Sequence, residues 1–144
     1  MKNLGLIVGL LSILVLASCG EEESERQAGD VIWRKGAPTI VPSHGPVPKK
    51  LIVKDLRAGK GAVLVDGKTG SFRFKSFDYR TGQGYEDWWD RPFVTGFGKG
   101  ESLDAWETGL KGMRVGGRRE LIVPIKEAYG GVPVVYVIEL VDLS

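Results

Sequence analysis

The sequence contains few of the residues from which many enzyme sites are built. Its 144 residues include one histidine, His44, and one cysteine, Cys19, which excludes histidine-based hydrolysis and Cys/His metal sites. Basic and acidic residues number 20 and 18, and this balance offers no electrostatic footprint for nucleic acid. We therefore expect no cofactor, no metal and no nucleic-acid partner.

The hydrophobic runs are also too short for a comfortable membrane span. Residues 4–17 are apolar apart from Ser12, whereas a spanning helix takes about 20 residues. Together with the short basic start at residues 1–3, this layout is typical of a secretory signal. The sequence predicts a signal peptide over residues 1–18.

The only cysteine stands where that signal ends. Residues 16–19 read LASC and resemble the bacterial lipobox, in which cleavage before the cysteine follows attachment of lipid to its sulfur. A lone thiol forms no intramolecular disulfide, so lipidation accounts for Cys19 better than redox or metal chemistry. We expect an extracytoplasmic protein that is lipid-anchored to a bacterial membrane through Cys19. The alternative is an incidental cysteine in an ordinary signal peptide or uncleaved anchor.

The next segment, residues 19–48, predicts a flexible tether. It is polar and then rich in proline, with no helical or strand periodicity. Its one apolar cluster, VIW at residues 31–33, either docks on the domain or forms a disordered patch. His44 lies between Ser43 and Gly45, as expected of a solvated loop residue.

The rest of the chain, residues 49–144, has the composition of one globular domain. Hydrophobic residues make up 42% of the sequence and charged residues 26%, and the 21 glycines favour short strands joined by turns. A further strand-like piece ends near Phe97, and the other segments that read as strands are 50–56, 62–65, 71–79, 118–124 and 134–143.

One stretch of this domain has helical periodicity. Apolar residues recur at spacings of three and four from Leu103 to Met113, which places them on one stripe of a helix. Ser102 is a candidate cap at its start and Gly112 a candidate end. The order of strands, one short helix and strands predicts an α+β domain, with the helix against one face of an antiparallel sheet.

Four segments carry a resemblance to a known family. They are KLIVKDLRAGKGA at 50–62, WDRPF at 89–93, WETGLKGMRVGGRRELIVP at 106–124 and EAYG at 127–130. In this order they resemble the FKBP-type peptidyl-prolyl cis-trans isomerases over nearly all of the domain. The resemblance implies a strongly bent antiparallel sheet wrapped around one short helix, and rotamase activity on X-Pro bonds. The implied partners are proline-containing unfolded or exported polypeptides, bound by a monomer.

The resemblance also implies an aromatic pocket for a proline side chain between helix and sheet, with Trp106 as its floor. The residues carried over as catalytic are Phe74, Tyr85, Glu86, Trp106 and Tyr129, and those carried over as substrate-binding are Phe93, Leu103 and Tyr136. By the same resemblance, the Tyr129 hydroxyl and the Leu103 amide are expected to hold substrate carbonyls. Without the resemblance, plain core packing is the simpler interpretation of the aromatic residues.

Such a pocket suits the chemistry of prolyl isomerisation. An X-Pro bond isomerises slowly because twisting its partial double bond meets a barrier of about 18–20 kcal/mol. The twisted amide has lost its resonance and much of its charge separation, so a dry apolar site favours it over the planar ground state. No nucleophile or proton transfer is needed, which agrees with a chain that has one histidine and one cysteine.

Three departures from the family pattern bear on activity. Phe74 stands where a tyrosine is usual, which removes a hydroxyl that supports the acid, and Tyr85-Glu86 replaces a Phe-Asp pair. After Tyr129 only residues 130–133 precede the last strand, where the family has a longer loop that walls the cleft. A missing wall admits water, so we expect proline binding with weakened catalysis. The alternatives to an isomerase are a peptide-binding or chaperone module tethered to the membrane, and an interaction protein whose cleft is vestigial.

Overall fold

The computed structural model describes residues 29–144. The predicted signal peptide and Cys19 lie outside these residues. Within them, no helix has the length and apolar character that a membrane crossing requires.

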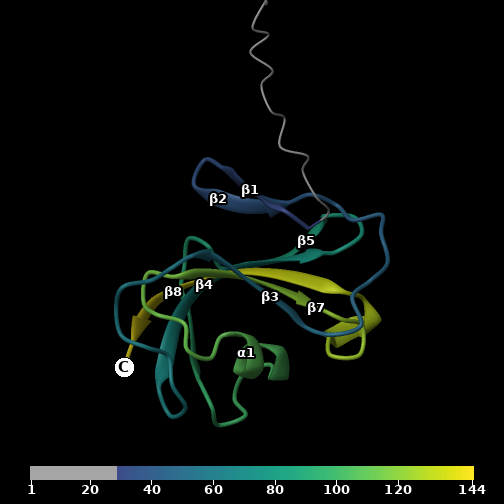
Figure 1. The fold of residues 1–144 in the computed structure, drawn as a ribbon. Helices are drawn as coiled ribbons and strands as arrows, with labels where there is room; N and C mark the ends of the chain where they lie inside the picture. Colours follow the sequence, from purple (N-terminus) through teal and green to yellow (C-terminus); the bar gives the residue numbers. More distant parts are fainter. Residues whose placement is uncertain (1–28) are drawn as a thin grey trace, which may run out of the picture.

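Six strands form one antiparallel sheet (Figure 1). They are β3 (Ile52–Arg57), β4 (Thr69–Asp78), β5 (Gly84–Asp87), β6 (Phe93–Gly96), β7 (Arg118–Val123) and β8 (Val134–Leu143). Their order is β3-β7-β8-β4-β5, and β6 also pairs with β4, so the two ten-residue strands β4 and β8 form the middle of the sheet. The predicted α+β architecture with an antiparallel sheet is confirmed.

One predicted strand, residues 62–65, is wrong. Val63 makes a single isolated bridge to Arg114. The Leu64 N–H donates to the Met113 carbonyl at 2.7 Å, and Leu64 is completely buried. The segment therefore pairs with the chain that leaves the helix rather than with the sheet.

The predicted helix is α1 (Asp104–Gly109), which is shorter than its apolar periodicity indicates. Its N-cap residue is Leu103, and no side chain caps the backbone. The Ser102 hydroxyl donates instead to Glu107 Oε1 at 2.6 Å. Beyond the helix the chain turns at Gly112, whose φ of 77° is a conformation that favours glycine.

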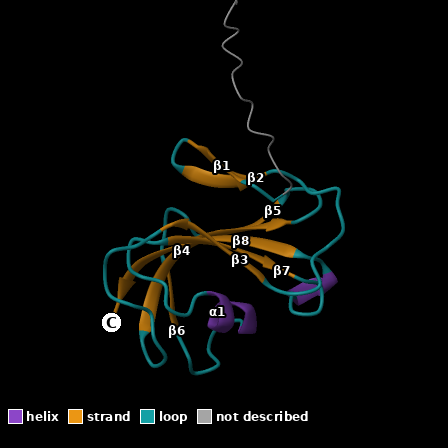
Figure 2. Ribbon diagram, in the orientation of Figure 1, coloured by secondary structure: helices purple, strands orange, loops and turns teal. Residues whose placement is uncertain are grey.

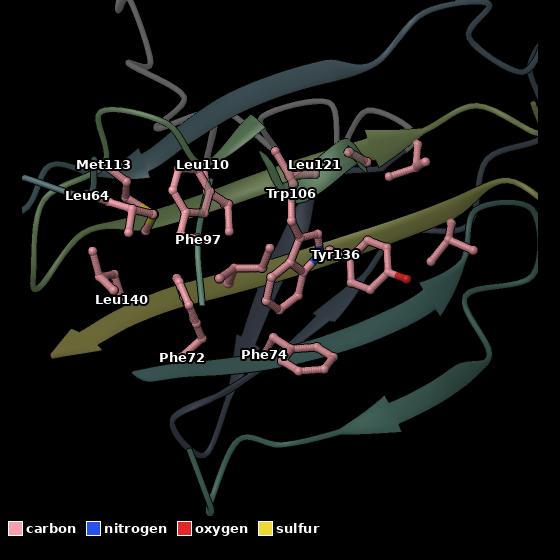
Figure 3. Packing of buried hydrophobic residues seen from close by; sticks show 14 residues of the cluster. Leu64, Phe72, Phe74, Phe97, Trp106, Leu110, Met113, Leu121, Tyr136 and Leu140 are labelled. Atoms are coloured by element: carbon pink, nitrogen blue, oxygen red, sulfur yellow. The ribbon is translucent and has the colours of Figure 1, made fainter. Parts of the chain in front are cut away.

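The sheet buries a hydrophobic cluster on each of its faces. The larger cluster lies on the face that α1 covers and is shown in Figure 3. The second cluster, on the opposite face, comprises Ile40, Phe77, Tyr79, Ile122, Val135 and Val137. Because side chains alternate along a strand, β8 supplies Tyr136 and Ile138 to the first cluster and Val135 and Val137 to the second.

A two-stranded hairpin, β1 (Val31–Arg34) and β2 (Ala37–Ile40), covers the second cluster. Figures 1 and 2 show it on the opposite side of the sheet from α1. Ile40 is 4% exposed and belongs to this cluster, against which Val31 and Val47 also pack. We call the two sides of the sheet the helix face and the hairpin face.

This hairpin corrects the flexible tether predicted for residues 19–48. Residues 29–48 belong to the fold, because Val31, Ile40 and Val47 pack on the apolar cluster of the hairpin face. The folded part therefore begins before the predicted boundary at residue 49. His44 is exposed in the loop that follows the hairpin.

Candidate active site

A cavity of about 310 Å³ lies between α1 and the helix face of the sheet. Seven of the eight residues predicted for the site line it: Phe74, Glu86, Phe93, Leu103, Trp106, Tyr129 and Tyr136. The volume is at the lower end of the range of about 300–1,000 Å³ found for ligand pockets. The rings therefore border an open cleft, which plain core packing does not explain.

Tyr85 is the predicted residue that the structure places outside this cleft. It is 48% exposed, and its hydroxyl donates to Asp78 Oδ2 at 2.6 Å. This hydrogen bond lowers the pKa of Asp78 and raises the pKa of Tyr85. Tyr85 and Glu86 are neighbours on β5, and successive side chains of a strand point to opposite faces, so Glu86 reaches the cleft and Tyr85 does not.

Trp106 lines the cleft from its buried side, and Figure 3 shows its ring beside those of Phe74 and Tyr136. Its side chain is 3% exposed, and edge-to-face contacts place its ring 4.9 Å from Phe74 and 5.8 Å from Tyr136. Within residues 29–144, its buried Nε1–H has no hydrogen-bond partner. Packing against two rings fixes the indole, so the floor is a rigid and largely apolar surface.

Glu86 is held at the rim of the cleft by Ser76. The Ser76 hydroxyl donates to Glu86 Oε2 at 3.2 Å and accepts from the Glu86 N–H at 3.1 Å. Ser76 lies two residues after Phe74 on β4, where side chains share a face. Ser76 therefore gives Glu86 the hydroxyl partner that a tyrosine at position 74 would otherwise provide. The sequence analysis did not predict this role for Ser76.

The central strand β8 brings a phenol into the cleft. Burial, with a smaller contribution from nearby Glu86 and Tyr129, raises the pKa of Tyr136 to about 12. The hydroxyl is therefore protonated at neutral pH and can donate a hydrogen bond to a ligand.

The two groups expected to hold substrate carbonyls both border the cleft. Tyr129 begins a short 3₁₀ turn, η1 (Tyr129–Gly131), and is 78% exposed, so its hydroxyl is open to a ligand. Leu103 precedes α1 with an extended backbone, and within residues 29–144 its N–H donates no backbone hydrogen bond. Both donors are available to a bound peptide.

The loop after Tyr129 is as short as its sequence indicates. Gly130 and Gly131, with φ angles of 84° and 69°, turn the chain, and β8 begins at Val134. Positive φ angles of this kind favour glycine. The turn leaves the Tyr129 side chain exposed and adds little enclosure to this side of the cleft.

Trp88 lines the cleft although the sequence analysis did not single it out. Its ring is stacked with Phe74 at 6.4 Å and lies 5.5 Å from Phe93. The signal was present, because Trp88 follows Glu86 by two residues in extended chain and so shares its face. The segment that leads into α1 adds three lining residues that no periodicity indicates: Gly100, Glu101 and Ser102.

Among the described residues, no group of three or more His, Cys, Asp and Glu side chains is placed to hold a metal ion.

The fold and the cleft together define an α+β domain in which a short helix and an antiparallel sheet enclose an aromatic site. A model of the family described as FKBP-type peptidyl-prolyl cis-trans isomerase matches residues 62–140. The chain belongs to this family, whose domain binds proline-containing peptides, and its activity is peptidyl-prolyl cis-trans isomerisation.

Individual relatives and solved structures agree with this assignment. The chain is 32% identical over 114 residues to the probable FK506-binding protein of Corynebacterium glutamicum, which covers 73% of this chain and 97% of that protein. It is 39% identical over 88 residues to the FK506-binding protein of Streptomyces anulatus, covering 60% and 71%. The crystal structure of FkpA from Escherichia coli is 26% identical with a TM-score of 0.58, covering 65% of this chain and 48% of that one. The crystal structure of AtFKBP13 shares the fold, with a TM-score of 0.60 and 21% identity. The match covers 68% of this chain and 96% of that one.

Proposed function

We propose that this isomerase acts on X-Pro bonds of exported proteins and receives the prolyl ring on Trp106. The observation that carries the proposal is the open, ring-lined cleft of about 310 Å³, whose floor is an indole that is itself only 3% exposed. A five-membered ring placed on that floor exchanges water for aromatic carbon on several sides. The amide bond that precedes it then lies at the mouth of the cleft.

The cleft favours the twisted amide by removing water from the rotating bond. A planar amide is stabilised by resonance and by solvated charge separation, and both decline as the C–N bond turns. The rings of Phe74, Phe93 and Trp106 do not replace the lost solvation of the planar form, so the twisted state loses less on entering the cleft. Only rotation about the C–N bond takes place, and no bond breaks and no proton moves.

Polar groups at the rim hold the peptide while this bond turns. The Tyr129 hydroxyl and the Leu103 N–H donate to substrate carbonyls, and the protonated Tyr136 hydroxyl is a third donor. Glu86, fixed by Ser76, accepts from a substrate N–H. Each 1.36 kcal/mol by which these contacts favour the twisted state raises the rate about tenfold.

A protease-coupled assay on X-Pro peptides tests this function. We expect the wild-type chain to accelerate cis-to-trans conversion, and Tyr129→Phe to lose part of the acceleration because it removes one hydroxyl without changing ring size. Peptide binding without acceleration would favour a second function, a peptide-binding or chaperone module. The 78% exposure of Tyr129 is the observation that favours this second candidate, because an open wall admits water.

The proposed site of action is outside the cytoplasm, with the protein anchored by lipid on Cys19. Residues 20–30, eleven in all, lie between this cysteine and the hairpin, and a chain of this length spans at most about 40 Å when fully extended. The domain would then work close to the bilayer. Labelling of cells with an alkyne fatty acid tests the anchor: we expect label on the wild type and none on Cys19→Ala, which should leave the membrane fraction. Label that persists on Cys19→Ala contradicts the anchor.

A further inference from the structure

Two neighbouring tryptophans between β5 and β6 contact opposite sides of the fold. Trp88 lines the cleft and is stacked with Phe74 at an interplanar angle of 25°. Trp89 is 8% exposed and contacts the hairpin: its ring centroid lies 5.5 Å from that of Trp33, and its Nε1–H donates to the Gly36 carbonyl at 3.0 Å. Two adjacent residues thus join the hairpin to one wall of the cleft.

Arg118 fixes this contact to the sheet. Its guanidinium carbon lies 4.3 Å from the Trp33 ring centroid and 5.7 Å from that of Trp89. Both distances are within the roughly 6 Å of a cation–π contact. Arg118 belongs to β7 and forms an ion pair with Glu139 of β8, so the cation cannot move away from the sheet easily. We call Trp33, Trp89 and Arg118 the hairpin clamp.

Few backbone hydrogen bonds hold the segment that carries Trp88. The segment lies outside both neighbouring strands, and the Trp88 N–H donates to the Phe74 carbonyl at 2.8 Å. The Trp89 N–H donates to Asp87 Oδ1 at 3.1 Å. The direction of the Trp88 ring therefore depends on side-chain packing, against Phe74 and Phe93 in the cleft and, through Trp89, against the hairpin.

Trp88 encloses a cleft that is open on the side of Tyr129. The short turn after Tyr129 leaves that side chain 78% exposed and encloses little. Trp88 is partly buried and contributes a large apolar ring to the lining. Because the reaction depends on excluding water, a ring that is free to swing out of the cleft would weaken it.

We propose that the β1–β2 hairpin is a positioning element of the active site, which through the hairpin clamp holds Trp88 as the apolar wall against the residue before the substrate proline. In this proposal Trp88 is the specificity-determining residue, because its ring lines the cleft that receives the substrate. Trp33, Trp89 and Arg118 are positioning residues that act through it. Loss of this wall would remove more contact from a leucine before proline than from an alanine. The inference goes beyond the proposed isomerase function and rests on it.

A kinetic test uses the full chain with Leu-Pro and Ala-Pro peptides. We expect Trp88→Ala to lower kcat/KM for the Leu-Pro peptide about tenfold, chiefly through KM, and for the Ala-Pro peptide less. Trp33→Ala should lower the Leu-Pro to Ala-Pro ratio about threefold, and Trp33→Phe should restore it by returning a ring to Arg118. Ile40→Val is the matched control, since it alters the same hairpin away from the clamp and should leave the ratio unchanged.

Fluorine NMR of protein labelled with 5-fluorotryptophan reads the wall without turnover. The chain has four tryptophans, and single Trp→Phe variants assign their resonances. Trp33 is 38% exposed, so we expect Trp33→Ala to fold, to shift or broaden the Trp88 resonance and to leave that of Trp106 in place. An unchanged Trp88 resonance together with an unchanged peptide ratio overturns the inference. A wild type without turnover would instead overturn the proposed function, while the fluorine spectra would still decide whether the hairpin positions Trp88.

Discussion

The two faces of the sheet are built from alternate residues of the same strands, yet they differ in the side chains that line their cavities. On the helix face, the rings around Trp106 leave a cavity of about 310 Å³. On the hairpin face, Ile40 packs on the second cluster, and a cavity of about 460 Å³ beside the hairpin is lined by the charged residues Lys54 and Glu120 as well as by Ile32 and Trp33. The ring-lined cleft of the helix face suits a prolyl ring better than the charged cavity does, and we expect the hairpin face to contribute stability and, in our proposal, to position Trp88.

The largest expected effect is the loss of the cleft floor. Trp106→Leu keeps an apolar side chain but removes the ring, and we expect kcat/KM to fall about 100-fold because the prolyl ring is no longer held or shielded. The protease-coupled assay measures this, with circular dichroism as the check on folding. A folded variant that retains activity within about twofold of the wild type would place the chemistry elsewhere.

The next effect is a pH dependence that arises on the helix face. A tyrosine in the unfolded chain ionises near pH 10, whereas folding raises the pKa of Tyr136 to about 12. The folded state keeps a proton that the unfolded state loses, so its stabilising effect is complete below pH 10 and is lost as pH rises toward 12. We expect the free energy of unfolding to fall by roughly 2–3 kcal/mol over this range. Urea unfolding measures it, and Tyr136→Phe should remove this part of the fall; equal slopes for both proteins would contradict the assignment.

A smaller effect concerns a substitution on the hairpin face that should lower stability without changing activity. Val137 is completely buried on the hairpin face, and Val137→Ala removes two buried carbon atoms, so we expect a loss of about 2 kcal/mol in the free energy of unfolding. At temperatures where the variant is folded, kcat/KM should equal that of the wild type. A fall in kcat/KM without a fall in stability would mean that the faces are not divided in this way.

The smallest effect concerns the support of Glu86. Ser76→Ala removes the hydroxyl that donates to this carboxylate, and a hydrogen bond worth about 1 kcal/mol corresponds to roughly a fivefold loss in kcat/KM. Ser71→Ala makes the same substitution on the same strand, where β4 pairs with β6, and serves as the control. If both variants retain full activity, Glu86 does not need Ser76 to act at the rim.

The helix face was largely predictable from sequence, because its residues follow simple periods. Alternation over 71–79 indicated β4, and the run at 134–143 gave β8 with both of its ends. Motif positions then placed seven of the eight predicted residues in the cleft. Tyr85 was misplaced because a motif does not say which of two strand neighbours faces inward.

The β1–β2 hairpin was not predictable in the same way. Its two strands have four residues each, which is too few for an alternating pattern to be recognised, and Pro38 in β2 argued against a strand. In the structure Pro38 pairs with Trp33 in a two-stranded sheet, where an edge position tolerates proline. The turn between the two strands has positive φ angles at Lys35 and Gly36. Lysine seldom adopts this conformation, so the sequence did not indicate a hairpin turn here. The role of Trp89 depends on this unforeseen layer and could not be inferred without it.

Two-dimensional NMR exchange on an equilibrated X-Pro peptide tests the central claim most directly, because it separates binding from catalysis. Without enzyme, cis and trans forms interconvert over tens to hundreds of seconds and give no exchange peaks on a shorter mixing time. We predict that a substoichiometric amount of the wild-type chain produces these peaks and that Trp106→Leu does not. Peptide resonances that shift on binding while exchange stays at the uncatalysed rate would contradict the account.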